Sequence, residues 1–383
     1  MATFNSTGTG GNWTDDATWA EAGQPAADGT DYVIITAGDT VVLTADTGTG
    51  AISIQGEITG AGFTLTLNGS GDSPLVNFDG TITATSTLDL TIEADENNNI
   101  DCLGTGTFND VIIDNTGYTT TLTHTLECAS LTITAGTLDT GSNKTLTVTG
   151  KTTIGDAGHS SEDQATLTCN ASAISLGSGK TDDYAIQMLA GGTFAGGSAN
   201  HTIGSIRQNV ANTKFTFTSA TTTINSEYTS EDRMFELITG KAYNADGRIT
   251  LTGNFTSSIQ WAVEVTGDTG PHTLRLNDAS LTVKPRTALI VEENLNIDAG
   301  TFNTSHDYSA NNALTVTGGV TGAGTLTTNA SAIIFGYLTM SGTYNATTDS
   351  SGTILTDRSG PGGQLLMDAA DIVHNNGYFV FKG

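Results

Sequence analysis

Cysteine and basic residues are scarce in this chain of 383 residues, and each shortage excludes a class of protein. Cys102, Cys128 and Cys169 lie far apart and form no C-x-x-C pair, so we expect free thiols, mostly buried, rather than a zinc site or a redox motif. The chain has 13 Lys+Arg against 40 Asp+Glu, a formal net charge of −27. This charge repels phosphate, which disfavours nucleic acids and anionic membranes as partners.

Long apolar runs and strong helix patterns are also missing. No run approaches the roughly 20 apolar residues of a membrane-spanning helix. The opening MATFNSTGTGG has no basic-then-apolar order, so we expect no secretory signal. The chain contains 71 Thr and 47 Gly, which are poor helix formers, so it cannot be mainly helical. The best short helix candidate is Gln364–Ile372.

Short runs of alternating apolar and polar residues dominate the sequence instead. Each alternates Leu, Ile, Val or Phe with Thr, Asn or Asp, and Gly, Asn or Asp closes the run, which is typical of strands with one buried face. The runs are 32–44, 63–69, 86–94, 110–115, 130–136, 144–150, 165–177, 214–224, 247–255, 272–283, 294–300 and 313–319.

The runs recur every 16 to 22 residues, with linkers too short for helical crossovers. That spacing fits one coil of a solenoid, in which a coil buries its inner face only by stacking on the next. The sequence therefore predicts an all-β fold, a right-handed parallel β-helix (β-solenoid) of Thr/Gly-rich coils with capped ends.

A long internal repeat supports this prediction. LTCNASAISLG at 167–177 matches LTTNASAIIFG at 326–336 in 8 of 11 positions. Upstream, 131–140 matches 295–304, and LTVTG recurs between the two matches in the same order. We interpret 128–180 and 292–340 as two related blocks of several coils.

Composition and repeats divide the chain into five parts. These are an N-terminal cap (1–45), a solenoid block (46–200), a divergent charge-neutral segment (201–290), a second solenoid block (291–341) and a C-terminal cap or oligomer contact (342–383).

The charge-neutral segment carries 8 acidic and 8 basic residues, whereas residues 1–200 carry 24 acidic and 3 basic ones. One hypothesis is that this segment contacts a neighbouring molecule, since it is free of self-repulsion. The alternative is a solvated face of different composition. The interface candidates are Arg207, Lys214, Arg233, Lys241, Arg248, Arg275, Lys284 and Arg286.

Two of the three tryptophans, Trp13 and Trp19, lie in the predicted N-terminal cap. Their rings would close the apolar interior of the first coil. The alternative role is stacking against a sugar.

The pattern G-N-W-x4-T-W, then P, D-x-V-x-I and G-x-T-V-x-L, covers residues 11–43. It resembles the opening segment of many β-helical surface proteins and of structural proteins from tailed phages. Beyond this stretch the resemblance rests on the Gly/Thr/Asn-rich coils alone. It implies a β-helical structural protein of the phage virion.

Motifs of known chemistry do not emerge. Asp182 and Asp183 form an acidic pair, but the other motifs of polygalacturonase-like β-helix enzymes are missing, and a D-D pair in an Asp-rich chain is usually a turn. The six histidines never fall at metal-ligand spacing. We therefore predict no enzyme and no cofactor; the acidic turn 95–101 leaves Ca²⁺ as the one ion to consider, against a solvated turn.

The sequence thus predicts a non-enzymatic structural protein on the exterior of a phage particle, either a capsid decoration or a component of a tail spike or fibre. Its expected partners are other virion proteins, further copies of itself in a homotrimer, and a host surface glycan, with neither nucleic acid nor membrane. The alternatives are a bacterial surface adhesin and a tailspike polysaccharide depolymerase.

Overall fold

The computed structural model describes most of the chain in two compact units. Unit 1 comprises Met1–Leu176 and Met188–Gly197, and unit 2 comprises Gly177–Gln187 and Ser198–Gly383. The described residues are 2–8, 10–26, 29–69, 76–82, 87–178, 184–226, 233–244, 247–253, 256–261, 270–305, 311–346, 352–356, 363–368, 371–373 and 377–382.

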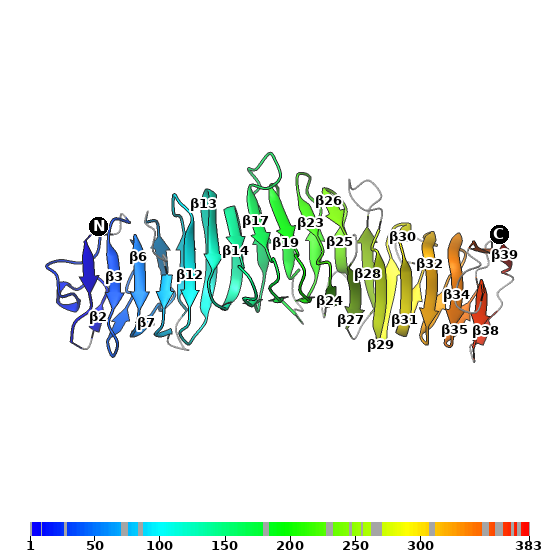
Figure 1. The fold of residues 1–383 in the computed structure, drawn as a ribbon, viewed down its shortest axis with the longest axis horizontal. Helices are drawn as coiled ribbons and strands as arrows, with labels where there is room; N and C mark the ends of the chain where they lie inside the picture. The colour runs from blue at the N-terminus through cyan, green and yellow to red at the C-terminus, as the bar shows by residue number, and fades with distance from the viewer. Residues whose placement is uncertain are drawn as a thin grey trace. The chain divides into compact units, whose positions relative to one another are not determined.

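Unit 1 is built from short strands that pair in parallel, as Figure 1 shows. Its strands are β1 (Thr3–Asn5), β2 (Gly10–Asn12), β3 (Tyr32–Ile35), β4 (Thr40–Val42), β5 (Thr47–Thr49), β6 (Ala51–Ile54), β7 (Glu57–Thr59), β8 (Thr64–Leu67), β9 (Val76–Phe78), β10 (Thr81–Ile82), β11 (Asp89–Ile92), β12 (Asn98–Cys102), β13 (Phe108–Leu122), β14 (Leu126–Asp139), β15 (Leu146–Val148), β16 (Thr152–Ile154), β17 (Ala165–Thr168), β18 (Ile174–Leu176) and β20 (Gly192–Ala195).

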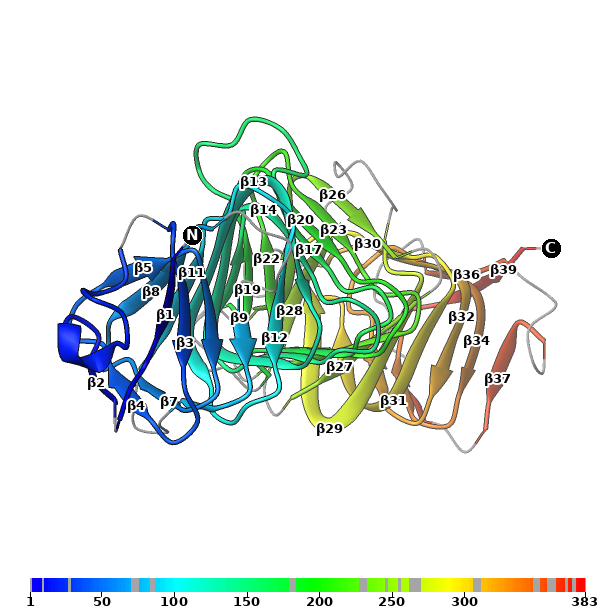
Figure 2. The ribbon, with the colours of Figure 1, turned by 60° about the vertical axis from the view of Figure 1, so that its left-hand side comes forward.

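Three parallel ladders run through the first coils of unit 1. The first joins β1, β3, β6, β9, β12 and the second half of β13. The second joins β2, β4, β7 and β10, and the third joins β5, β8, β11 and the first half of β13. Figure 2 shows β5 and β8 on one side of these coils and β4 and β7 on another. The fold is therefore an all-β parallel solenoid, as the sequence predicts.

Unit 2 follows the same plan. Its strands are β21 (His201–Ile203), β22 (Ile206–Gln208), β23 (Lys214–Thr216), β24 (Thr221–Asn225), β25 (Arg233–Leu237), β26 (Lys241–Tyr243), β27 (Arg248–Thr252), β28 (Thr256–Trp261), β29 (Thr273–Pro285), β30 (Leu289–Val291), β31 (Asn294–Asn303), β32 (Leu314–Gly322), β33 (Thr325–Thr327), β34 (Ile333–Met340), β35 (Thr343–Asn345), β36 (Thr353–Leu355), β37 (Leu365–Met367), β38 (Asp371–Val373) and β39 (Phe379–Phe381). The strand β19 (Ile186–Met188) has residues in both units.

The core of each unit is a column of stacked apolar side chains. In β3, Val33 and Ile35 point inward and are fully buried, whereas Tyr32 and Ile34 are partly exposed. Ile35 pairs with Ile54 on the next coil, which in turn pairs with Phe78. Burying each such side chain contributes roughly 1.5–3 kcal/mol. The alternation in the sequence therefore selects which face of every strand enters the core.

Coil length varies more widely than the predicted 16 to 22 residues. Thr40 pairs with Glu57, 17 positions later, whereas Gly10 pairs with Thr40, 30 positions later. Extra residues are accommodated in the turns, where longer loops cost little conformational entropy, and in local register shifts such as those between Ile113 and Thr119 of β13.

The internal repeat folds in the same way in both units. In unit 1, β14 pairs with β17 and β15 pairs with β18. In unit 2, the matching strands β31 and β33, and β32 and β34, pair in the equivalent registers. The matched strands therefore pair in the same pattern in both units.

A buried corner of each matched segment contains an equivalent hydrogen bond. Thr140 Oγ1 donates to the carbonyl of Cys169 at 2.8 Å, and Thr304 Oγ1 donates to the carbonyl of Thr328 at 2.7 Å. All four residues are buried. The two bonds therefore satisfy threonine hydroxyls and backbone carbonyls that would otherwise be costly to bury. The repeated N-A-S sequence supplies the turn, since both of its asparagines have a φ of 48°.

Residues near the N-terminus cover the edge of strand β1 that does not pair with β3. The carbonyl of Asn5 in β1 accepts from the backbone N–H of Ala20 at 2.8 Å, and the Asn5 N–H donates to Glu21 Oε2 at 2.8 Å. The same N–H holds the pKa of the Glu21 carboxyl below its ordinary value. The edge of β1 is thus paired, which prevents a foreign strand from adding to it.

Trp13 and Trp19 lie within this N-terminal segment. Their rings meet edge to face with centroids 5.2 Å apart, and Trp19 Nε1 donates to the Trp13 carbonyl at 2.9 Å. They are only 2% and 4% exposed. A sugar would have no open indole face to stack on, so the geometry favours the packing role.

The helix candidate Gln364–Ile372 is wrong. The structure places β37 and β38 there, paired in parallel with β34 and β35. Leu and Ala favour helix locally, but an adjacent coil offers a ladder of backbone partners, and tertiary pairing overrides weak propensity.

Candidate functional site

The eight basic residues of 201–290 do not form one face. They are split between separate ladders of unit 2. Arg207, Arg233 and Lys284 lie on the ladder of β22, β25, β28 and the second half of β29. Lys214 and Lys241 lie on the ladder of β23 and β26. Arg248 and Arg275 lie on the ladder of β24, β27 and the first half of β29, and Arg286 follows β29. The Arg233 side chain lies outside the described part of the structure. The segment is therefore not a single cationic surface.

Arg207 is committed to a contact inside unit 2. Its Nε lies 3.5 Å from Glu236 Oε2, and its guanidinium carbon lies 5.3 Å from the centroid of the Tyr184 ring. Tyr184 OH donates to the same Glu236 oxygen at 3.3 Å. Glu236 is 3% exposed, so Arg207 supplies the positive charge for a buried carboxylate.

Arg275 is also paired within the chain, with Asp298 on the next coil. Its Nε lies 2.6 Å from Asp298 Oδ2. Lys214 approaches the Tyr243 ring, with its Nζ 6.0 Å from the centroid. Arg248 at the start of β27 is exposed, and among the described residues no ion pair to it is found. Of the candidates whose side chains are described, Arg248 is the most open to a neighbour.

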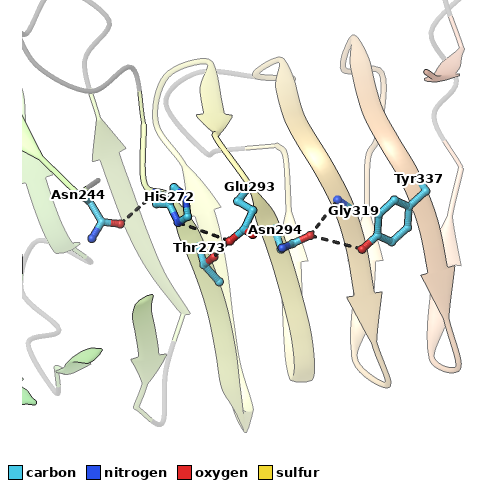
Figure 3. A network of polar contacts seen from close by, with 7 residues as sticks. All are labelled: Asn244, His272, Thr273, Glu293, Asn294, Gly319 and Tyr337. Carbon is cyan, nitrogen blue, oxygen red and sulfur yellow. Dashed lines mark hydrogen bonds and ion pairs between the residues drawn. The ribbon is translucent and has the colours of Figure 1, made fainter. Parts of the chain in front are cut away.

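A polar network runs from Asn244, which follows β26, along the ladder of β29, β31, β32 and β34 (Figure 3). Asn244 Oδ1 accepts from the backbone N–H of His272 at 2.9 Å. Glu293 Oε2 lies 3.4 Å from His272 Nδ1 and accepts from Thr273 Oγ1 at 2.8 Å. Asn294 begins the next part of the network.

Asn294 Oδ1 accepts from the Gly319 N–H at 3.1 Å and from Tyr337 OH at 3.5 Å. These partners come from β31, β32 and β34, so the network joins successive coils through their outer side chains, as Figure 3 shows. Its members mainly satisfy one another.

The network does not have the order of a catalytic triad. In a triad the imidazole stands between the carboxylate and the nucleophile. Here Glu293 stands in the middle, and the Thr273 hydroxyl donates to this carboxylate rather than to His272. The arrangement therefore ties coils together and does not activate a hydroxyl.

The other histidines and the pair of Asp182 and Asp183 are the remaining candidates for a chemical role. His124 Nδ1 contacts Asp101 at 2.5 Å, and His201 is buried. His306, His374, Asp182 and Asp183 lie outside the described residues. Where the chain is described, no three His, Cys, Asp or Glu side chains are grouped to hold a metal ion.

The acidic turn 95–101 is bonded to neighbouring groups. Asn97 Oδ1 accepts from the Thr119 N–H at 2.8 Å, and Asn98 Nδ2 donates to the Glu96 carbonyl at 3.0 Å. The bond to Thr119 and the contact between Asp101 and His124 link the turn to the following coil, whereas the bond between Asn98 and Glu96 lies within the turn.

A hollow of about 360 Å³ opens on the surface of unit 1. It is lined by residues of the turn 116–118 within β13, where Tyr118 is exposed, and by Gly136 of β14. The loop between β16 and β17 contributes His159, Asp163 and Gln164 to the lining.

Comparison with known proteins gives no guide to this surface. Searches of protein-family models, curated proteins and solved structures found no match to the chain. Within the described part of the chain, no helix is long and apolar enough to span a membrane.

Sequence reasoning missed this hollow. Tyr118, Gly136 and His159 come from three separate coils, and their approach depends on the ladder register. Only the sequence around Gly158 and His159, which is typical of a turn, marks a loop at this place. Among the described residues, the hollow is the strongest candidate for a binding site.

Proposed function

We propose that this chain is a non-enzymatic structural protein on the exterior of a tailed-phage particle, as a capsid decoration or part of a tail spike or fibre. The observation that carries the proposal is the parallel solenoid core of both units. Buried apolar side chains stack from coil to coil, and polar side chains on the outside form hydrogen bonds between successive coils. Such a fold suits a structural element on a particle surface. The N-terminal pattern at 11–43 points to the same class of protein.

Charge supports a place outside the shell. The net charge of −27 would bring the chain into repulsion with packaged DNA. Arg207 and Arg275 are paired with carboxylates of the chain, so their positive charges are not available to bind phosphate groups of a nucleic acid.

Contacts with copies of itself or with other virion proteins are part of the proposal. In the segment 342–383, five large apolar side chains are between 40 and 54% exposed. They are Leu366, Ile372, Val373, Tyr378 and Phe381. Exposed apolar groups gathered in one segment are typical of an interaction surface, and a homotrimer is the assembly we propose.

Mass spectrometry of particles purified from the host that carries the gene tests this function. The proposal predicts that the chain is recovered with the purified particles, at a fixed molar ratio to the major capsid protein. Recovery in the cell envelope instead would contradict the proposal and favour the surface adhesin.

A further inference from the structure

The hollow of unit 1 is held in shape by hydrogen bonds of its own loop. Gln164 Oε1 accepts from the backbone N–H groups of Ser160 and Ser161 at 3.1 and 3.2 Å. Asp163 adopts a φ of 61°, and its Oδ1 accepts from Thr193 Oγ1 at 2.7 Å. These bonds fix the loop and leave Asp163 Oδ2 for a ligand.

His159 is fixed on the same wall. A Cβ on Gly191 would lie 2.6 Å from His159 Nδ1, so the ring rests directly on the Gly191 backbone. Its Nδ1 is buried and has no hydrogen-bond partner among the described residues.

Several side chains around the hollow can accept a hydrogen bond. Asp163 supplies a carboxylate, His159 an imidazole and Tyr118 a phenol ring, and the remaining lining consists of Thr, Gly, Ala and Gln. The lining contains neither Lys nor Arg where it is described. Residues 1–200 carry 24 acidic and 3 basic residues, so the surrounding field favours a cation.

We propose that this hollow binds a primary ammonium group. Its three N–H donors match the Asp163 carboxylate and the threonine hydroxyls, and the Tyr118 ring offers a face for a cation. A volume of about 360 Å³ accommodates an alkylammonium chain. The ammonium group can belong to a lysine side chain of a neighbouring protein or to a free polyamine. The inference stands independently of the proposed virion role.

Isothermal titration of the full chain tests the proposal with three probes. Nα-acetyl-lysine methylamide represents the lysine side chain, spermidine represents the free polyamine, and Nα-acetyl-norleucine methylamide lacks the charge. We expect a Kd of about 1 mM or tighter for at least one amine and binding at least tenfold weaker for norleucine. The tighter of the two amines identifies the source. Equal binding of the norleucine probe, or no amine binding, overturns the proposal.

Matched variants locate the site. Asp163→Asn should weaken amine binding at least tenfold, whereas Asp16→Asn removes the same charge from an exposed residue of the N-terminal segment, away from the lining, and should change it less than twofold. Equal effects of the two variants would mean that only general attraction acts, which overturns the proposal. If Asp163→Asn alters the melting temperature, Tyr118→Leu replaces it, with an expected weakening of at least threefold. Preference for a neutral hexose over both amines also overturns it.

Discussion

At the scale of single residues, charge in unit 2 is used to satisfy buried groups. Glu236 would be costly to bury alone, and it lies between Arg207 and the hydroxyl of Tyr184. A basic residue that sequence analysis assigns to an external interface therefore has an internal partner. Burial, which composition does not reveal, separates the two roles.

Arg207→Met tests this assignment. The variant leaves Glu236 without its cation, and we expect a loss of about 2 kcal/mol in the free energy of unfolding, below the value for a fully buried pair because Arg207 is about one third exposed. Arg248→Met, at an exposed position, should change it by less than about 0.5 kcal/mol. Urea titration followed by circular dichroism measures both. Equal losses would contradict the internal role of Arg207.

The cysteines give a second prediction at this scale. The structure leaves all three thiols free, with Cys128 and Cys169 buried and Cys102 half-buried. Burial raises the pKa of Cys102 and Cys128 to about 12, and raises that of Cys169 as well. At pH 8 roughly one thiol in 10⁴ is then ionised.

We therefore expect the folded protein to react with a disulfide reagent at least about 100-fold more slowly than free cysteine, and all three thiols to react at once in denaturant. Cys102, which lines a hollow of about 140 Å³, should react first. A fast reaction of Cys169 in the folded protein would show that its coil opens.

At the scale of elements, glycine positions show how closely the coils stack. Gly136 has a φ of 78°, and a Cβ added there would lie 2.4 Å from the Asn115 carbonyl oxygen on the preceding coil. Gly117 has a φ of 83°, but a Cβ there would meet no atom within 4 Å. The two sites share backbone strain and differ only in the space available.

Gly136→Ala and Gly117→Ala form a matched pair for this reason. We expect Gly117→Ala to cost about 1 kcal/mol of stability from the left-handed backbone alone. Gly136→Ala should cost about 3 kcal/mol, because the methyl group also pushes the coils apart. Thermal unfolding of both variants measures the difference. Equal costs would contradict the close approach at Gly136.

The sequence predicts these elements where its pattern carries the physical cause. Alternation fixes which side chains enter the core, and the duplicated N-A-S turns at Asn170 and Asn329 identify matching corners. The segment Gln364–Ile372 is mispredicted as helix because its strand pairing depends on β34 and β35. The hollow at Tyr118 and Asp163 depends on coil register, which alternation alone does not define.

At the scale of the whole molecule, the mass in solution tests the proposed homotrimer. Light scattering of the purified protein should give a mass near three times 39.3 kDa. Ile372→Asp together with Phe381→Asp places charge on the exposed apolar segment, and we expect it to yield monomers. Ile334→Asp, at an exposed position of β34, is the control and should leave the mass unchanged. A monomer for the unaltered chain would contradict the trimer.

The most direct test of the central claim is antibody labelling of intact, purified particles, viewed by electron microscopy. An antibody raised against the folded chain should label the outside of unbroken particles at regular positions. Labelling only after the particles are broken, or detection of the chain in the lysate with no particle labelled, would contradict a structural role on the particle exterior.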